Sequence, residues 1–296
     1  MQRFVLVGVI LLCLAAEFAE AQSFYARRRE RSLIFVGGAG TSSYYGELAN
    51  NGDYLQAKPT VNVGLQMYLN RRIGIRADVS WFQLTGSDAK ADDESRKKRN
   101  LSFHSDNFEI STVAIYNFFA QGRRFYQRPA INFYGFAGIG LCYFNPKTEY
   151  QGKTYALAPL HTELVSYSRV TPVIPMGLGL RMKVGPYTNL SFEGGYRTTF
   201  TDYLDDVSTI HHAASKFTDP IAAALSDRRP EVGKPIAPDG TQRGNPGKND
   251  AYFLFTAKIE YYLPVNFLQG NAQQKTFKKK RKAFYRYNKK GGLKKK

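Results

Sequence analysis

The sequence predicts an all-β protein: an eight-stranded antiparallel transmembrane β-barrel of the small outer-membrane type, with a disordered basic C-terminal tail. Three observations predict this fold. Eight segments alternate apolar with polar residues, the connections between them are alternately long and short, and the chain begins with an export signal. Alternation is typical of strands because successive side chains point to opposite faces of a sheet. An even strand number, with long loops at one end and short turns at the other, is typical of bacterial outer-membrane barrels.

Residues 1–21 have the pattern of a secretory signal peptide. Arg3 supplies a positive charge, residues 4–16 are an apolar run too short to remain as a membrane span, and Ala19-Glu20-Ala21 is a small-x-small cleavage site. Because Cys13 is lost with the signal, Cys142 is the only cysteine expected in the mature chain. This excludes a disulfide framework and a cysteine-based zinc site.

The first four strands are expected over residues 33–45, 60–70, 73–81 and 108–118. The first is rich in glycine, which leaves room where a small barrel is crowded. The second alternates well, with Val61 and Val63 on one face and Asn62 on the other. A tight connection follows the second strand, whereas residues 85–106 form a long polar loop after the third.

The last four strands are expected over residues 131–144, 174–183, 189–200 and 251–263. The final one separates cleanly into a face with Phe253, Phe255 and Ile259 and a face with Lys258 and Glu260. Long loops over residues 145–168 and 201–250 precede the sixth and eighth strands. We therefore expect the barrel to occupy residues 22–267 and the basic tail to occupy residues 268–296.

Charged residues on the polar strand faces are expected to fill the lumen. An eight-stranded barrel is just wide enough inside for side chains to fill it, and unpaired charges there would be very costly. A near-balanced set of charges therefore predicts a polar plug rather than a pore. The expected network comprises Arg76, Asp78, Glu109, Arg181, Glu193, Arg197, Lys258 and Glu260, with Lys183 as a further cation.

Aromatic residues near the strand ends are expected to form interface girdles. A soluble secreted barrel also alternates, with its apolar face inward, so alternation alone does not place the protein in a membrane. The loop asymmetry, the export signal and the aromatic strand ends favour the membrane. The girdle residues are expected to be Tyr44, Tyr45, Trp81, Phe82, Phe118, Phe144, Phe200, Tyr261 and Tyr262.

Two segments carry a resemblance to a known family. Thr201-Asp-Tyr-Leu-Asp-Asp-Val-Ser208 and Phe133-Tyr-Gly-Phe-Ala-Gly-Ile-Gly-Leu-Cys-Tyr-Phe-Asn-Pro146 resemble a family of outer-membrane barrels from the Bacteroidetes that includes PorG of the type IX secretion and gliding machinery. The resemblance covers the signal and the whole barrel. It implies a non-enzymatic barrel that anchors or stabilises a periplasmic protein-secretion complex, with ring proteins similar to PorK and PorN as partners. The chain departs from ordinary barrels in that its last strand is not its end, so Phe267 or Tyr262 replaces the usual terminal aromatic.

The tail concentrates the positive charge of the chain. Residues 275–296 hold twelve basic residues and no acid, within a formal net charge of +18. After a signal peptide and an even number of strands, the tail is expected in the periplasm, so nucleic acid is not an expected partner. Anionic outer-membrane lipid, peptidoglycan carboxylates or an acidic protein surface can meet it there, and a solvated tail is the plainer alternative. The expected partner-binding residues are Lys278, Lys279, Lys280, Arg281, Lys282, Arg286, Lys289 and Lys290.

The start of the last long loop is rich in acids, at Asp202, Asp205 and Asp206 beside Tyr203. Their spacing is not that of an EF-hand. Turn and capping bonds that order the loop are favoured over a cation site, and no cofactor or metal is expected.

Two other functions remain as alternatives, a small outer-membrane porin and a lipid-modifying barrel enzyme. The paired interior charges argue against a pore. His104, His161, His211 and His212 are expected in exterior loops rather than at a strand end beside a serine, which argues against an enzyme.

Overall fold

The structure is a computed structural model that describes residues 33–50, 58–122 and 127–264. The expected signal peptide and basic tail lie outside the described residues. Eight antiparallel strands form a closed barrel, in which each strand pairs with its neighbour in the chain and β1 pairs with β10. The barrel strands are β1 (Leu33–Tyr45), β2 (Lys58–Tyr68), β3 (Ile73–Ser87), β4 (Ser102–Asn117), β5 (Ile131–Tyr143), β8 (Val170–Lys183), β9 (Thr188–Thr199) and β10 (Ala251–Tyr262). The predicted eight-stranded antiparallel barrel is confirmed.

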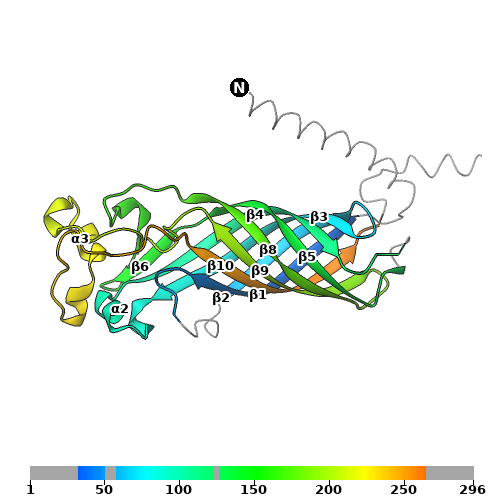
Figure 1. The fold of residues 1–296 in the computed structure, drawn as a ribbon, viewed down its shortest axis with the longest axis horizontal. Coiled ribbons are helices and arrows are strands. Elements are labelled where there is room, and N and C mark those ends of the chain that lie inside the picture. The colour runs from blue at the N-terminus through cyan, green and yellow to red at the C-terminus, as the bar shows by residue number, and fades with distance from the viewer. Residues whose placement is uncertain (1–32, 51–57, 123–126, 265–296) are drawn as a thin grey trace, which may run out of the picture.

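The long connections gather at one end of the barrel, which we call the mouth, and the short turns lie at the other (Figure 1). The turns join β2 to β3, β4 to β5 and β8 to β9. Helices in the mouth are short: α2 (Glu94–Arg99), α3 (Pro220–Ser226) and the 3-10 turns η2 (Asp88–Lys90), η4 (Ala158–Leu160), η5 (Ala214–Lys216) and η6 (Arg229–Val232). Among the described residues, no helix is both long and apolar enough to cross a membrane.

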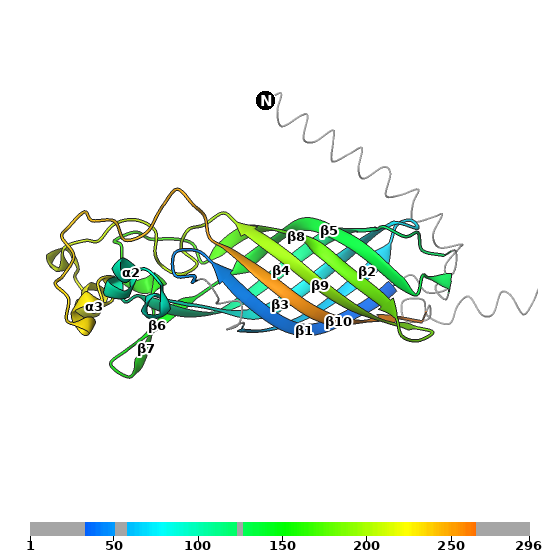
Figure 2. The ribbon, with the colours of Figure 1, turned by 60° about the horizontal axis from the view of Figure 1, so that its bottom comes forward.

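The mouth contains more regular structure than the alternation predicted. β3 and β4 continue as a paired ribbon to Ser87 and Ser102, into both ends of the segment expected as a polar loop. β6 (Pro146–Tyr150) and β7 (Lys153–Ala156) form a hairpin within the second expected loop, and β6 lies against the extension of β4 (Figure 2). The inner faces of the β3 and β4 extensions carry Phe82, Leu84 and Phe103, but polar residues and Gly86 interrupt the pattern at the tip, so the alternation fades there.

The outer face of the barrel is apolar. Strand residues that point outward are exposed and large, and they come from all eight strands. Such a continuous band is too large for an ordinary water-facing surface, whereas it suits the hydrocarbon layer of a bilayer. Its members include Phe35, Val63, Leu65, Val79, Phe108, Ile110, Phe133, Ile139, Leu141, Leu178, Tyr196, Phe255 and Ile259.

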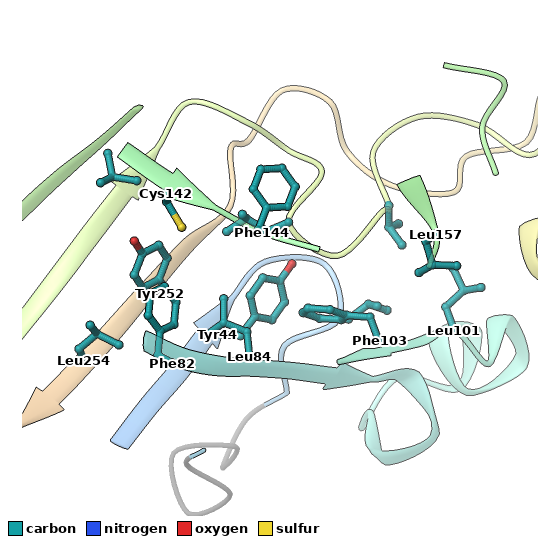
Figure 3. Close-up of a cluster of buried hydrophobic side chains, with 14 of the residues drawn as sticks. Tyr44, Phe82, Leu84, Leu101, Phe103, Cys142, Phe144, Leu157, Tyr252 and Leu254 are labelled. Atoms are coloured by element: carbon teal, nitrogen blue, oxygen red, sulfur yellow. The ribbon is translucent and has the colours of Figure 1, made fainter. Parts of the chain in front are cut away.

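Apolar side chains close the mouth from the inside. A buried apolar cluster lies there, and its members come from both strands and loops (Figure 3). They include Tyr44, Phe82, Phe103 and Phe144. The rings of Phe82 and Tyr252 stack within it at 4.6 Å. The inner parts of the loops therefore pack against the strand ends as a cap over the mouth.

The expected aromatic girdle is wrong for four of its residues. Trp81, Phe118, Phe200 and Tyr261 are at least partly exposed, but Tyr44, Phe82, Phe144 and Tyr262 are buried inside the barrel. The reason is the strand period. Of two consecutive aromatics on one strand, only one can face outward.

Candidate functional site

The lumen centre is organised around Glu193 of β9. Arg76 of β3 forms a two-pronged ion pair with it, with Nη1–Oε1 at 2.5 Å and Nη2–Oε2 at 2.9 Å. Lys258 Nζ of β10 lies 2.5 Å from Oε2, and the Tyr134 hydroxyl of β5 donates to Oε1 at 2.6 Å. Arg76 Nε also pairs with Asp78 at 2.6 Å. One carboxylate thus joins strands from several sides of the barrel.

A second ion pair lies between β8 and β10. Arg181 Nε is 2.7 Å from Glu260 Oε2, and its Nη1 donates to Asn117 Oδ1 at 2.7 Å. The guanidinium also lies over the Tyr134 ring at 4.3 Å, a cation–π contact. Asn189 donates to the same glutamate at 3.0 Å. Arg181 and Glu260 are both buried.

A third pair is looser. Arg197 Nε lies 3.5 Å from Glu109 Oε2, and the Tyr252 hydroxyl donates to that oxygen at 2.7 Å. With it, the structure places all eight expected network residues in the lumen, as four cations paired with four carboxylates. Lys183 differs, because it lies at the end of β8 and is exposed. Its expected place in the lumen is wrong.

The turn end is held by a residue that the sequence pattern did not single out. Arg128 donates to the carbonyls of Gly185, Pro186 and Thr188 at 2.6, 2.9 and 3.0 Å, and to Asn189 Oδ1 at 2.6 Å. It thereby fixes the β8–β9 turn to the connection after β4. A lone arginine in a linker carries no signal of such a role.

At the mouth, the structure separates the members of the expected loop motif. Asp206 accepts hydrogen bonds from Tyr167 at 2.6 Å and from Thr162. Its φ of 68° is a conformation that aspartate tolerates better than most residues. Burial raises the pKa of Asp206 to about 6, although Arg243 and both hydroxyls oppose that shift. Asp206 therefore orders the loop, as the turn interpretation expects, and Tyr203 stacks on Tyr167 at 4.6 Å.

Glu163 and Arg243 join two of the mouth loops. Arg243 Nη1 lies 2.6 Å from Glu163 Oε1 and donates to the Asp206 carbonyl at 2.5 Å. Glu163 also accepts from the backbone N–H groups of Ser208 and Thr209, each at 2.9 Å. Burial alone would raise the pKa of Glu163, but Arg243 and these donors outweigh it and lower the pKa.

Asp202 and Asp205 lie in a different environment from Asp206. Asp202 gathers with Glu47, which follows β1, and Asp250, which precedes β10. Burial raises the pKa of Asp202 to about 7, with the nearby Ser208 hydroxyl in opposition and Glu47 adding to the rise. Burial also raises the pKa values of Asp205 and Asp250, and the neighbouring carboxylates raise them further. This acidic cluster joins residues that are far apart in the sequence, so their spacing could not reveal it.

The histidines do not share one setting. His104 lies in β4 rather than in a loop, and His161 is exposed. His211 is buried, and His212 lies 3.9 Å from Asp239. Among the described residues, none of the four histidines belongs to the carboxylate group formed by Glu47, Asp202 and Asp250. The expected partner-binding residues of the tail, from Lys278 to Lys290, lie outside the described residues.

Comparison with known proteins gives one family match. The family model described as "Domain of unknown function (DUF6089)" matches residues 5–218. A search of curated proteins finds no match.

Several solved barrels resemble the chain at low sequence identity. Neisserial surface protein A is 11% identical with a TM-score of 0.41, covering 78% of this chain and 97% of that one. The attachment invasion locus protein Ail of Yersinia pestis is 10% identical with a TM-score of 0.38, covering 78% and 98%. A major outer membrane protein of Thermus thermophilus is 11% identical with a TM-score of 0.39, covering 78% and 99%. The fold of this chain rests on its own strand pairing.

Proposed function

The chain belongs to the family described as "Domain of unknown function (DUF6089)", and from its barrel we propose that it is a non-enzymatic outer-membrane protein that anchors a periplasmic protein-secretion complex. The partners are ring proteins similar to PorK and PorN of the type IX secretion and gliding machinery. Outer-membrane lipid surrounds the barrel, and peptidoglycan is a further candidate partner.

The outer face supports residence in a membrane. Each barrel strand has between 11 and 16 residues, which is enough for a tilted crossing of a bilayer. The exposed band of aliphatic and aromatic side chains would be costly in water, at about 25 cal/mol per Å² of apolar surface. Together with the export signal in the sequence, this supports the outer membrane as the location.

The filled lumen supports an anchor over a porin. The four cations and four carboxylates are buried and paired, and the apolar cap closes the mouth above them. An open water-filled path would have to separate these pairs, which is strongly unfavourable when one partner stays buried. We therefore expect little conductance in a planar bilayer.

The observation that carries the proposal is the direction in which β10 leaves the barrel. β10 ends at Tyr262 on the rim that carries the short turns, opposite the mouth. The twelve basic residues of 275–296 follow in the sequence. Their charge suits an acidic protein surface on the periplasmic side, in keeping with the resemblance to the type IX family.

The test is crosslinking and affinity purification from membranes of the native host. Removal of residues 275–296 should release the periplasmic partners while the barrel stays in the outer-membrane fraction and still shifts on a gel after heating. A matched variant with the same tail composition in shuffled order separates charge from sequence. Unchanged recovery of the partners with the shortened chain would contradict the role of the tail, and recovery of the protein in the soluble fraction would contradict the membrane location.

A further inference from the structure

We propose that the mouth of the barrel binds one divalent cation between Glu47, Asp202 and Asp250. Each side chain offers a carboxylate oxygen, and these oxygens lie within 4.8 Å of one another. The site goes beyond the proposed function and does not depend on it, because it lies at the opposite end of the barrel from Tyr262, the last residue of β10.

The fold brings the three carboxylates together at the base of the last loop. The Asp250 N–H donates to the Thr201 carbonyl at 3.0 Å, so the loop leaves β9 and returns to β10 at one point. The Thr199 hydroxyl donates to the Asp250 carbonyl at 2.6 Å and fixes the same junction. Glu47 reaches it from β1, the other neighbour of β10.

Several carboxylate oxygens of the site have no partner. Asp202 is only 6% exposed, yet neither of its oxygens accepts a hydrogen bond within the described residues. Glu47 Oε2 and Asp205 Oδ2 are buried and unpaired in the same way. Buried polar atoms without a partner are uncommon in folded proteins, and an ion absent from the coordinates is one standard reason for them.

No cation of the protein neutralises the cluster. In the described parts of the chain, none of the carboxylates of Glu47, Asp202, Asp205 and Asp250 forms an ion pair. Arg99 is near enough to act electrostatically on Glu47 and Asp205, but its Nε and Nη2 bind Asp88 at 2.6 and 2.9 Å. Its remaining Nη1 donates to the Arg243 carbonyl. A bound cation would supply the missing positive charge.

The donors that do reach the cluster orient it. The Tyr44 hydroxyl donates to Asp250 Oδ1 at 2.7 Å, and the Leu204 N–H donates to Oδ2 at 3.0 Å. The Val207 N–H donates to Asp205 Oδ1 at 2.9 Å, which leaves Oδ2 free. These bonds hold the carboxylates in place before an ion arrives, as metal ligands usually require.

Gly46 makes room for this arrangement. A Cβ atom at position 46 would lie 1.9 Å from both Asp250 Oδ1 and the Tyr44 hydroxyl. Any side chain at that position would therefore push Asp250 and Tyr44 out of place.

The ligand set favours calcium. Carboxylate oxygens are hard donors that suit Ca²⁺ and Mg²⁺, and the cluster contains no sulfur or imidazole ligand. Ca²⁺ tolerates irregular geometry, whereas Mg²⁺ needs a near-ideal octahedron. Three carboxylates from two connections, the one after β1 and the one between β9 and β10, form an irregular ligand set that matches the calcium preference, with water completing the shell.

The test uses the full-length protein in detergent, with Ca²⁺ measured by titration calorimetry and Tb³⁺ by its luminescence. Tyr44 lies beside the site and should sensitise Tb³⁺, and added Ca²⁺ should quench that signal by displacement. Asp202→Asn should weaken Ca²⁺ binding by more than about tenfold, a loss typical even of outer-shell changes. Gly46→Ala should weaken binding without a change of charge, and Tyr44→Phe should reduce sensitised emission.

Asp239→Asn is the matched control, because Asp239 is an exposed loop acid that pairs with Lys216 at 2.6 Å. It should bind Ca²⁺ as the parent does. The heat-dependent gel shift verifies that each variant forms the barrel. The proposal is overturned if the folded parent binds neither Ca²⁺ nor Mg²⁺ at millimolar concentration, or if Asp202→Asn binds Ca²⁺ as tightly as the control.

Discussion

Arg243 Nη1 lies 2.6 Å from Glu163 Oε1, and this contact joins the connection after β7 to the connection after β9. Both side chains are 2% exposed. The same guanidinium donates to the Asp206 and Ser226 carbonyls. Arg243 therefore binds three separate segments of the mouth, at Glu163, Asp206 and Ser226. The cap over the barrel is therefore held by a buried ion pair as well as by apolar packing.

Glu163→Gln is expected to loosen this cap. The substitution leaves Arg243 buried without its counter-charge, which costs about 3–5 kcal/mol in comparable cases. Protease digestion and hydrogen exchange should show residues 201–250 opening more often, while the β-barrel still resists unfolding. Glu231→Gln is a suitable control, because Glu231 is a less buried loop acid that pairs with Arg228. Equal protection of the loop in parent and Glu163→Gln would contradict the role of the pair.

Glu193→Gln is expected to destabilise the barrel itself. Arg76 and Lys258 both pair with Glu193, so the neutral side chain leaves two buried cations with too little negative charge. We expect a loss of about 3–5 kcal/mol, measured as a lower urea midpoint of the refolded protein in lipid vesicles. Glu149→Gln changes an exposed acid of β6 and should leave the midpoint unchanged. A parent-like midpoint for Glu193→Gln would show that the lumen charges are not coupled to stability.

Gly179→Ala is expected to overpack the lumen beside Tyr134. The two residues are direct partners in the β5–β8 register, and a Cβ at position 179 would lie 2.3 Å from Tyr134 Cζ. Overpacking of this kind costs about 1–3 kcal/mol and would displace the Tyr134 hydroxyl from Glu193. Gly135→Ala is the matched control, because its Cβ would meet nothing closer than 3.8 Å. If both variants unfold at the same urea concentration, the tight contact between Gly179 and Tyr134 is wrong.

His211 is expected to make the mouth loop weaken in acid. Burial, with a smaller contribution from Arg243, lowers its pKa to about 4, although Asp227 opposes the shift. Above the ordinary histidine pKa of about 6.5, His211 is neutral in the folded and the open loop, and it has no effect on stability. As the pH falls from there towards about 4, the open loop takes up a proton that the folded loop excludes, which costs at most about 3 kcal/mol.

The measurement for His211 is hydrogen exchange of residues 201–250 between pH 7 and pH 4. His211→Gln should lose less protection over this range than the parent does, and the difference between the two isolates His211 from the carboxylates nearby. His212→Gln, which alters a more exposed neighbour, should follow the parent. An identical pH profile for parent and His211→Gln would refute the prediction.

The barrel itself was predictable because apolar and polar residues alternate along its strands with a period of two residues. All eight barrel strands were expected, and Leu33–Tyr45 has the same bounds in the structure. Aromatic residues occupy both faces of β5: Tyr134 and Phe136 point inward while Phe133 points outward. The same alternation predicts which charged residues face the lumen, but it does not predict which of them form ion pairs. Arg76 meets Glu193 only because the sheet closes.

The mouth was not predictable in the same way. Its contacts join side chains from separate connections, as with Glu163 and Arg243 or Glu47 and Asp202, and no spacing in the sequence links them. The acidic motif at Asp202–Asp206 could be recognised in the sequence. The different roles of Asp206, which orders the loop, and Asp202, which lies in the proposed cation site, depend on neighbours from the other loops. Long loops that pack on one another therefore hide their sites from pattern-based prediction.

The pairing of β1 with β10 has a mechanical consequence. The register runs from Ile34 opposite Tyr262 to Tyr45 opposite Ala251, and β10 is paired on its other side with β9. A force applied along the axis of β10 would load both ladders of hydrogen bonds in shear and all of them together. Shear is the direction in which a β-ladder resists force best, because no bond can break before its neighbours share the load. The closing strand is thus well placed to resist a force applied along it.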